Sequence, residues 1–253
     1  MSEIDNYKPG SFCWTELATN DRKKAAEFYG ALFGWEANER PMGPDDVYVM
    51  LTKNGKTVGA LYQDTRSGAP PHWNNYVAVE SADVASDKAK SLGGSVIVGP
   101  MDVFEAGRAA FIADPEGAVI AVWQPKLNKG AELYSEEGAL CWNELMSHDE
   151  ERARTFYTSL FGWTAKASPE YTELHLGEQP IGGIFPMRGE IFAKIPANWM
   201  PYFAVADCDA STAKVKSLGG RIMKEPDDIP NTGRFSMVGD PQGAMFNLFE
   251  PKM

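Results

Sequence analysis

The chain has 253 residues, of which 43% are hydrophobic, which is enough for a buried core and, at about 100–200 residues per domain, for two domains. A mainly disordered chain is therefore excluded. The formal net charge is −11, divided as −5 over residues 1–128 (12 basic, 17 acidic) and −6 over residues 129–253 (12 basic, 18 acidic). This even acidity argues against a nucleic acid or an anionic membrane as partner. The sequence shows no run of about 20 apolar residues and no signal-peptide pattern, and the three cysteines are too few for a disulfide framework, so we expect a cytoplasmic protein with reduced thiols.

The first half of the chain runs twice through a strand, a helix and further strands. Period-2 alternation marks the strands, and apolar residues at helical spacing mark the helices. Asn20 and Asp21 can cap the first helix, and Asn54-Gly55 is a hairpin-turn pair. The predicted elements are strand 10–17, a helix ending at Gly34, strands 46–53, 57–63 and 75–80, helix 83–92, and strands 95–98, 107–113 and 118–124.

The second half of the chain repeats the first. CWTEL at 13–17 recurs as CWNEL at 141–145, and FYGALFGW at 28–35 recurs as FYTSLFGW at 156–163, both at an offset of 128. The offset is 123 between Tyr48 and Tyr171, and it is 126 in the later segments. We therefore predict four βαβββ modules in two homologous domains, 9–125 and 139–252, joined by a linker over 126–138.

These features resemble the vicinal oxygen chelate superfamily, which includes glyoxalase I, the bleomycin and fosfomycin resistance proteins and the extradiol dioxygenases. The resemblance implies an α+β fold in which two βαβββ modules form a cupped mixed β-sheet, with the ligand on the concave face. It does not imply one reaction, because this fold carries several chemistries. The matching residues are Asp21, Phe28-Tyr29, Leu32 to Trp35, Gly93-Gly94 and Asp114 to Gly117 in the first half, and Asp149, Phe156-Tyr157, Leu160 to Trp163, Gly219-Gly220 and Asp240 to Gly243 in the second.

In this superfamily a metal ion, when present, takes one ligand from each of four strands, and the resemblance assigns these positions here. They are Trp14, Ala60 or Tyr62, Asn74 and Ala121 in the first half, and Trp142, Gly183 or Phe185, Met200 and Asn247 in the second. No histidine or carboxylate stands at any of them, although divalent metals need such donors. We therefore expect no metal site and no other cofactor.

Strand alternation predicts which side chains face the cup. If Trp14 faces the concave side, Phe12 and Glu16 do too, and Cys13 faces the helices as a small buried residue. Aromatic walls with few polar groups are typical of small-molecule sites, although these aromatic residues could instead fill a core that has no ligand. The predicted ligand-binding residues are Trp14, Glu16, Tyr76 and Trp123 in the first half, and Trp142, Glu144, Tyr202, Asn247 and Phe249 in the second.

Glu16 and Glu144 are the candidate chemical groups, because an unpaired carboxylate among apolar neighbours is costly. Three roles remain open for them. Each could form a structural ion pair, with Arg108 or Arg234, or act as a ligand-contacting acid or base with a raised pKa, or lie on the surface.

The three histidines, His72, His148 and His175, lie at places that do not correspond in the repeat, which favours loop or surface roles. His148 is at an expected helix N-cap. Asp114 and Asp240 are expected to brace their turns.

The leading hypothesis is a metal-independent small-molecule-binding protein with one aromatic cup per domain, as a monomer or a homodimer. The alternative is a lyase, isomerase or hydroxylase-like enzyme that uses Glu16 or Glu144 as acid or base, or an atypical metal site. A third hypothesis is a structural or interaction protein with filled cups.

Overall fold

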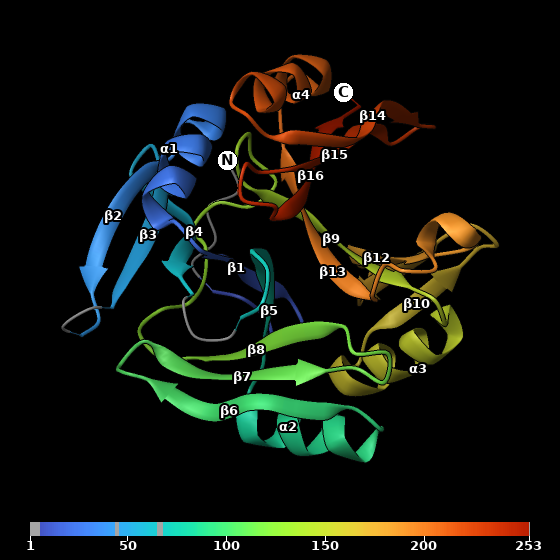
Figure 1. Ribbon diagram of the computed structural model, residues 1–253. Helices are drawn as coiled ribbons and strands as arrows, with labels where there is room; N and C mark the ends of the chain where they lie inside the picture. The colour runs from blue at the N-terminus through green and yellow to red at the C-terminus, as the bar shows by residue number, and fades with distance from the viewer. Residues whose placement is uncertain (1–5, 44–45, 65–67, 253) are drawn as a thin grey trace.

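The computed structural model describes residues 6–43, 46–64 and 68–252 (Figure 1). Over these ranges the chain forms two eight-stranded mixed sheets, neither of which closes into a barrel. The strand order is β2-β3-β4-β1-β5-β8-β7-β6 in the first sheet and β10-β11-β12-β9-β13-β16-β15-β14 in the second. Each sheet therefore uses strands from one half of the chain only. The predicted α+β fold built from a repeated module is confirmed.

The elements of the first half lie between residues 12 and 125. They are β1 (Phe12–Thr19), α1 (Arg22–Phe33), β2 (Glu36–Pro41), β3 (Val47–Lys53), β4 (Lys56–Gln63), β5 (His72–Ala78), α2 (Ala82–Ser91), β6 (Ser95–Val103), β7 (Gly107–Ala113) and β8 (Val119–Pro125).

The elements of the second half follow the same order, with one added short helix. They are β9 (Leu140–Ser147), α3 (Glu150–Phe161), β10 (Thr164–Ala167), β11 (Thr172–Leu176), β12 (Gln179–Pro186), the 3-10 helix η1 (Glu190–Phe192), β13 (Asn198–Ala204), α4 (Cys208–Ser217), β14 (Arg221–Ile229), β15 (Gly233–Gly239) and β16 (Met245–Pro251).

Local sequence explains where the first elements begin and end. The Asp21 carboxylate accepts a hydrogen bond from the Lys24 backbone N–H at 3.1 Å and caps α1, and Gly34, at a φ of 74°, ends it in the left-handed conformation. Asn54 and Gly55, at φ of 52° and 77°, make the predicted hairpin turn between β3 and β4.

Two predictions about the element limits are wrong. No strand is predicted between the helix that ends at Gly34 and the strand at 46–53, but residues 36–41 form β2, an edge strand whose six residues are all exposed and therefore show no apolar alternation. The N-cap of α3 is Asp149, which accepts from the Arg152 backbone N–H at 3.1 Å, and not His148, whose ring bonds to the Ile195 carbonyl.

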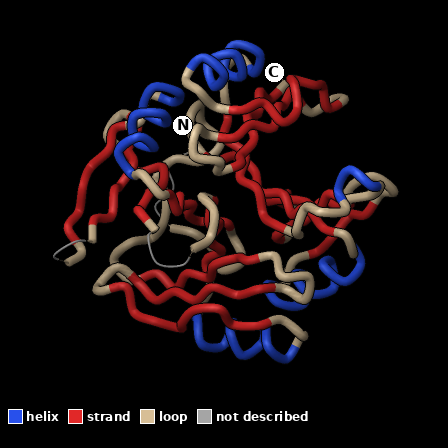
Figure 2. Tube along the Cα trace, in the orientation of Figure 1, coloured by secondary structure: helices blue, strands red, loops and turns tan. Residues whose placement is uncertain are grey.

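The helices bring the two halves together. Figures 1 and 2 show α1 beside α4 and α2 beside α3, and contacts join both pairs. One buried apolar cluster combines α1 residues such as Phe28 with Phe203 and Phe246 of the second half. Another combines α2 residues such as Ala89 with Phe156 of α3. The strands therefore pair within halves, whereas the cores are shared between halves.

Two hydrogen-bond chains cross between the halves, and we name them latches. In the first, the Trp73 indole N–H donates to the Tyr29 hydroxyl at 3.2 Å, and Tyr29 donates to Asp240 Oδ2 at 3.1 Å. The Oδ1 atom of Asp240 meanwhile accepts three backbone N–H groups of its own turn, which confirms the predicted bracing role. The second latch has the same form and consists of Trp199, Tyr157 and Asp114.

No helix in the described ranges is both long enough and apolar enough to span a bilayer.

Candidate functional site

A β-bulge in β1 sets the direction of the side chains around Glu16. Phe12 pairs with Val77 and Trp14 with Tyr76, so Cys13 is an extra residue without a partner in β5. The prediction that Phe12 faces the concave side is wrong, because the bulge turns its ring to Trp163 and Trp199 of the second half, at 5.5 and 5.3 Å between ring centroids. Cys13 is buried in a cluster with Trp14 and away from the helices, so its predicted helix-facing position is also wrong.

The first-half cluster consists of Trp14, Glu16, Tyr48 and Tyr76. The Tyr48 hydroxyl accepts from the Trp14 indole N–H at 3.2 Å and donates to Glu16 Oε2 at 2.6 Å. The Tyr76 hydroxyl donates to Glu16 Oε1 at 2.5 Å. Each carboxylate oxygen of Glu16 thus has a tyrosine donor, and the residue is only 6% exposed.

The second-half cluster repeats this arrangement with Trp142, Glu144, Tyr171 and Tyr202. Trp142 donates to the Tyr171 hydroxyl at 2.9 Å, and the Tyr202 hydroxyl donates to Glu144 Oε1 at 2.9 Å. Tyr171 is the second tyrosine partner of this carboxyl group. A bulge at Cys141 matches the one at Cys13, because Trp142 pairs with Tyr202 and Leu140 with Phe203.

Burial raises the pKa of both glutamates. The loss of hydration raises the pKa of Glu144 from 4.5 to about 7, although hydrogen bonds from Tyr202 and Tyr171 oppose this shift. The pKa of Glu16 is raised for the same reason, against the hydrogen bonds from Tyr48 and Tyr76. Burial, and after it the nearby carboxylates, raises the pKa values of the four tyrosines, which therefore remain hydroxyl donors at neutral pH.

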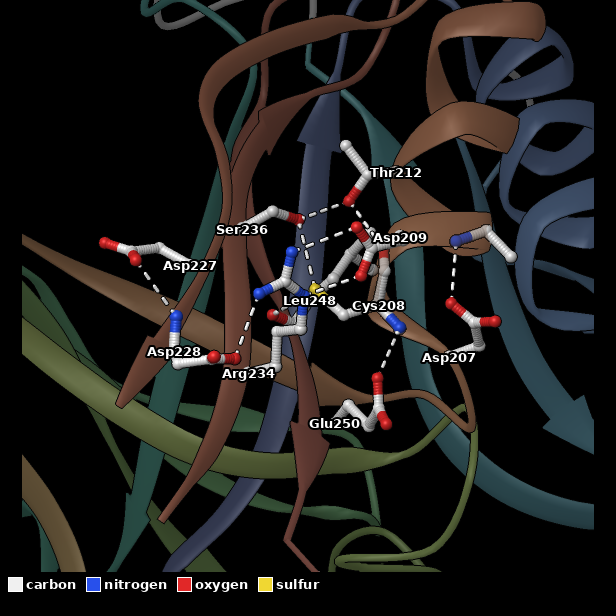
Figure 3. Close-up of polar contacts among 11 residues, drawn as sticks. Asp207, Cys208, Asp209, Thr212, Asp227, Asp228, Arg234, Ser236, Leu248 and Glu250 are labelled. Atoms are coloured by element: carbon white, nitrogen blue, oxygen red, sulfur yellow. Dashed lines mark hydrogen bonds and ion pairs between the residues drawn. The ribbon is translucent and has the colours of Figure 1, made fainter. Parts of the chain in front are cut away.

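The structural ion pairs considered for these glutamates do not form. Arg108 binds Asp83 at 2.8 Å and Asp102 at 3.4 Å. Arg234 likewise lies between Asp209 and Asp228 beside the start of α4, as Figure 3 shows. Neither glutamate is on the surface either, so two of the three roles are excluded. The structure shows each glutamate as a buried acid bonded to tyrosine hydroxyls, and its role as a ligand-contacting acid or base stays a prediction.

Other predicted site residues surround these clusters. Trp123 lies 6.4 Å from Tyr76 and Phe249 lies 6.5 Å from Tyr202, both measured between ring centroids in edge-on contact. Asn247 is in register with Tyr202 on the neighbouring strand, so the two side chains point to the same face. The structure thus places Trp123, Phe249 and Asn247 beside the tyrosines that bond to the glutamates, and their role in ligand binding stays a prediction.

Tyr48 and Tyr171 were missed as site residues. Their correspondence at an offset of 123 was visible in the sequence, and a tyrosine that recurs in a strand was the available signal. The predicted cup residues lie on the strands near the four positions where the superfamily places metal ligands. Neither tyrosine stands at one of these positions.

The prediction of a loop or surface role is wrong for His175, because this side chain is buried. Its Nε2 lies 2.6 Å from Glu173 Oε2, and its Nδ1 has no hydrogen-bond partner among the described residues. Glu173 precedes it on β11, two residues after Tyr171. The histidine has no counterpart in the first half, where Thr52 stands at the same offset from Tyr48.

Comparison with known proteins agrees with this fold. The model of the glyoxalase/bleomycin resistance protein/dioxygenase superfamily matches residues 11–122 and 142–248. The chain belongs to this superfamily. It is 39% identical to CFP32 of Mycobacterium tuberculosis, a protein named as a glyoxylase, over 99% of this chain and 98% of that protein. It is 33% identical to the anthracycline biosynthesis protein DnrV of Streptomyces peucetius, over 98% of this chain and 95% of that protein.

Solved structures show the same fold at low sequence identity. The Mn(II)-bound glyoxalase from Novosphingobium aromaticivorans has a TM-score of 0.66 and 14% identity, with 96% of this chain and 82% of that chain covered. A catechol 2,3-dioxygenase has a TM-score of 0.64 and 13% identity, with 97% and 89% covered. At these sequence identities the likeness to the solved structures shows the fold alone.

Proposed function

We propose that this chain is a metal-independent small-molecule-binding protein, with the aromatic residues around Glu16 and Glu144 as its candidate sites. The observation that carries the proposal is the repeated buried carboxyl group bonded to two tyrosines, while Arg108 and Arg234 pair with other carboxylates. Holding such a group among aromatic rings destabilises the fold, and groups of this kind gather at functional clefts. Aromatic walls with a few polar groups are the usual surroundings of a small ligand.

The donor set supports metal independence. In the first sheet Glu16 lies in register with Ala60 and Asn74, and Tyr76 lies in register with Ala121. These neighbouring positions contain a single carboxylate, and both of its oxygens already accept tyrosine hydroxyls. In the second sheet the partners of Glu144 are Gly183 and Met200. No three histidine, cysteine, aspartate or glutamate side chains gather as a metal site anywhere in the described part of the chain. These residues do not fit the divalent metal that some superfamily members bind.

The name of one relative, DnrV, favours an aromatic ligand. DnrV is named for anthracycline biosynthesis, and anthracyclines are polycyclic aromatic molecules. Rings of this kind would stack on the tryptophan and tyrosine side chains of the clusters.

A second candidate function is proton transfer by Glu144. Its pKa of about 7 is close to the optimum for a general acid or base at neutral pH, and this observation favours an enzyme of the lyase or isomerase type. The name of CFP32 as a glyoxylase agrees with catalysis.

Titration of the purified protein with two-ring aromatic probes, naphthalene and 2-quinolone, tests the proposal. We expect saturable quenching of tryptophan fluorescence, unchanged by EDTA, and elemental analysis without stoichiometric metal. One tightly held equivalent of zinc, manganese, nickel or iron, or the absence of binding by both probes, would contradict the proposal. Conversion of a bound probe that depends on Glu144 would favour the second candidate instead.

A further inference from the structure

The two glutamate–tyrosine clusters each consist of one tryptophan, one glutamate and two tyrosines, but they differ in the polar groups around them. In the first half, Asn74 donates to the Tyr62 hydroxyl at 3.5 Å, and both oxygens of Glu16 accept tyrosine hydroxyls. The polar side chains next to Glu16 therefore bond to one another.

The second half has an unpartnered amide in this region. Asn247 is 0% exposed, and neither its amide nitrogen nor its amide oxygen has a hydrogen-bond partner among the described residues. It shares a sheet face with Tyr202, which bonds to Glu144. The corresponding residue of the first half is Ala121, which is in register with Tyr76 and has no polar side-chain atom. A buried amide without partners destabilises the fold, so a group that supplies both bonds would be favoured there.

The clusters also differ in what covers them. The linker lies against the first half, where the Trp123 indole N–H donates to the Asn128 carbonyl at 2.9 Å. Ala131 and Tyr7 pack into the same buried cluster as Trp14 and Tyr76. In the second half, by contrast, Trp142, Phe235 and Phe249 are only half-buried.

We propose that the ligand binds in the second half only. Asn247 recognises a ligand that carries a hydrogen-bond donor next to an acceptor. The amide nitrogen of Asn247 donates to the acceptor, and its amide oxygen accepts from the donor. Lactams, carboxamides and hydroxy-ketones on a planar aromatic frame have this edge, and the half-buried rings of Trp142, Phe235 and Phe249 suit the frame. Ligands with a fixed negative charge are disfavoured by the carboxyl groups of Glu144 and Glu173. This inference rests on the proposed function and narrows it to one site and one ligand class.

A paired-probe titration tests the inference. The lactam of 2-quinolone presents N–H beside C=O, whereas naphthalene has a similar two-ring frame without polar atoms. We expect calorimetry to give one 2-quinolone site per chain. Asn247→Ala, which installs the residue of the first half, should weaken 2-quinolone about tenfold and leave naphthalene within about threefold, because two hydrogen bonds of roughly 0.5–1.5 kcal/mol each are lost.

Two further variants make the result decisive. Asn247→Leu keeps the side-chain volume and should reproduce the selective loss, and it provides the readout if Asn247→Ala perturbs folding. Tyr62→Phe removes a hydroxyl from the first half, where the second half has Phe185, and should change neither affinity. Two sites per chain, equal losses for both probes, or a 2-quinolone loss in Tyr62→Phe would overturn the inference while leaving ligand binding intact. Failure of both probes to bind the wild-type chain would refute the proposed function itself.

Discussion

At the scale of single residues, the unusual feature is a buried acid whose partners are neutral donors. A salt bridge would hold the carboxylate charged, but two tyrosine hydroxyls stabilise the charge less than water does, so desolvation raises the pKa of Glu144 to about 7. Glu144 can therefore take up or release a proton near neutral pH without moving an arginine. Glu16 is likewise buried and bonded to two tyrosine hydroxyls, and its pKa is shifted in the same direction.

The raised pKa of Glu144 predicts a loss of stability as the pH rises. Below pH 4.5 the group is protonated in both the folded and the unfolded chain and contributes no difference. Between pH 4.5 and about 7 the unfolded chain releases the proton while the folded chain keeps it, so the free energy of unfolding falls, and above pH 7 the loss is complete. A shift of this size corresponds to about 3 kcal/mol.

Glu144→Gln should remove this pH dependence, because glutamine still accepts a tyrosine hydroxyl and does not ionise. We expect the variant to match the wild type at pH 4 and to be more stable at pH 8 by up to about 3 kcal/mol, measured by urea unfolding at both values. Glu16→Gln should shift stability in the same direction. A loss of more than about 3 kcal/mol in both variants at pH 8 would show that these residues are scaffold and not site acids.

The sequence could predict this site only in part. The spacing from Trp14 to Glu16 recurs as Trp142 to Glu144. This repeat was enough to predict that each glutamate lies on the same sheet face as its tryptophan. The tyrosines that bond them lie on β3, β5 and β13 and, for Tyr171, directly before β11, and only the strand register decides which hydroxyl meets which oxygen. The bulge at Cys13 adds one unpaired residue that no alternation rule shows, which is why Phe12 was placed on the wrong face.

At the scale of secondary-structure elements, apolar patterning predicted the buried strands well and the exposed edge strand poorly. Strand β7 matches its predicted limits because one of its faces is buried, whereas β2 has no buried residue to reveal its period. Asp114 and Asp240 accept backbone N–H groups of their own Asp-Pro-x-Gly turns, as predicted. Their second role, as acceptors for a tyrosine of the other half, depends on how the halves pack and has no local signal.

The latches predict a specific cost for Tyr29→Phe. The ring remains packed against Trp73 at 5.3 Å between centroids, but the loss of the hydroxyl leaves the Trp73 indole N–H and Asp240 Oδ2 without this partner. Each orphaned buried group costs about 1–3 kcal/mol, so the unfolding midpoint should fall clearly. Tyr157→Phe, in the second latch, should behave alike.

Tyr134→Phe is the matched control, because Tyr134 packs on the same apolar cluster and is in neither latch. A destabilisation by Tyr29→Phe no larger than that of the control would show that the latch contributes no net stability.

At the scale of the whole molecule, strand pairing and core formation follow different divisions of the chain. All strands of one sheet come from one half of the chain. The domain limits near 9–125 and 139–252 stay a prediction, and they coincide with the division between the two sheets. The apolar clusters instead pair α1 with the second half's last module and α2 with its first. The sequence repeat indicated the sheets, but it contained no signal for the packing partner of each helix.

This division predicts that the fragment 1–128 does not persist as a folded monomer. Without the second half, Phe28, Phe33 and the apolar side of α2 lose their cover, and the Tyr29 hydroxyl loses Asp240. Because Asp114 corresponds to Asp240 in the repeat, two fragments can cover each other, with Tyr29 of one bonding to Asp114 of the other. We expect light scattering after size-exclusion chromatography to show a dimer at micromolar concentration, and Tyr29→Phe to weaken it. A monodisperse monomer with cooperative unfolding would mean that each half carries a sufficient core of its own, contrary to the shared clusters of the intact chain.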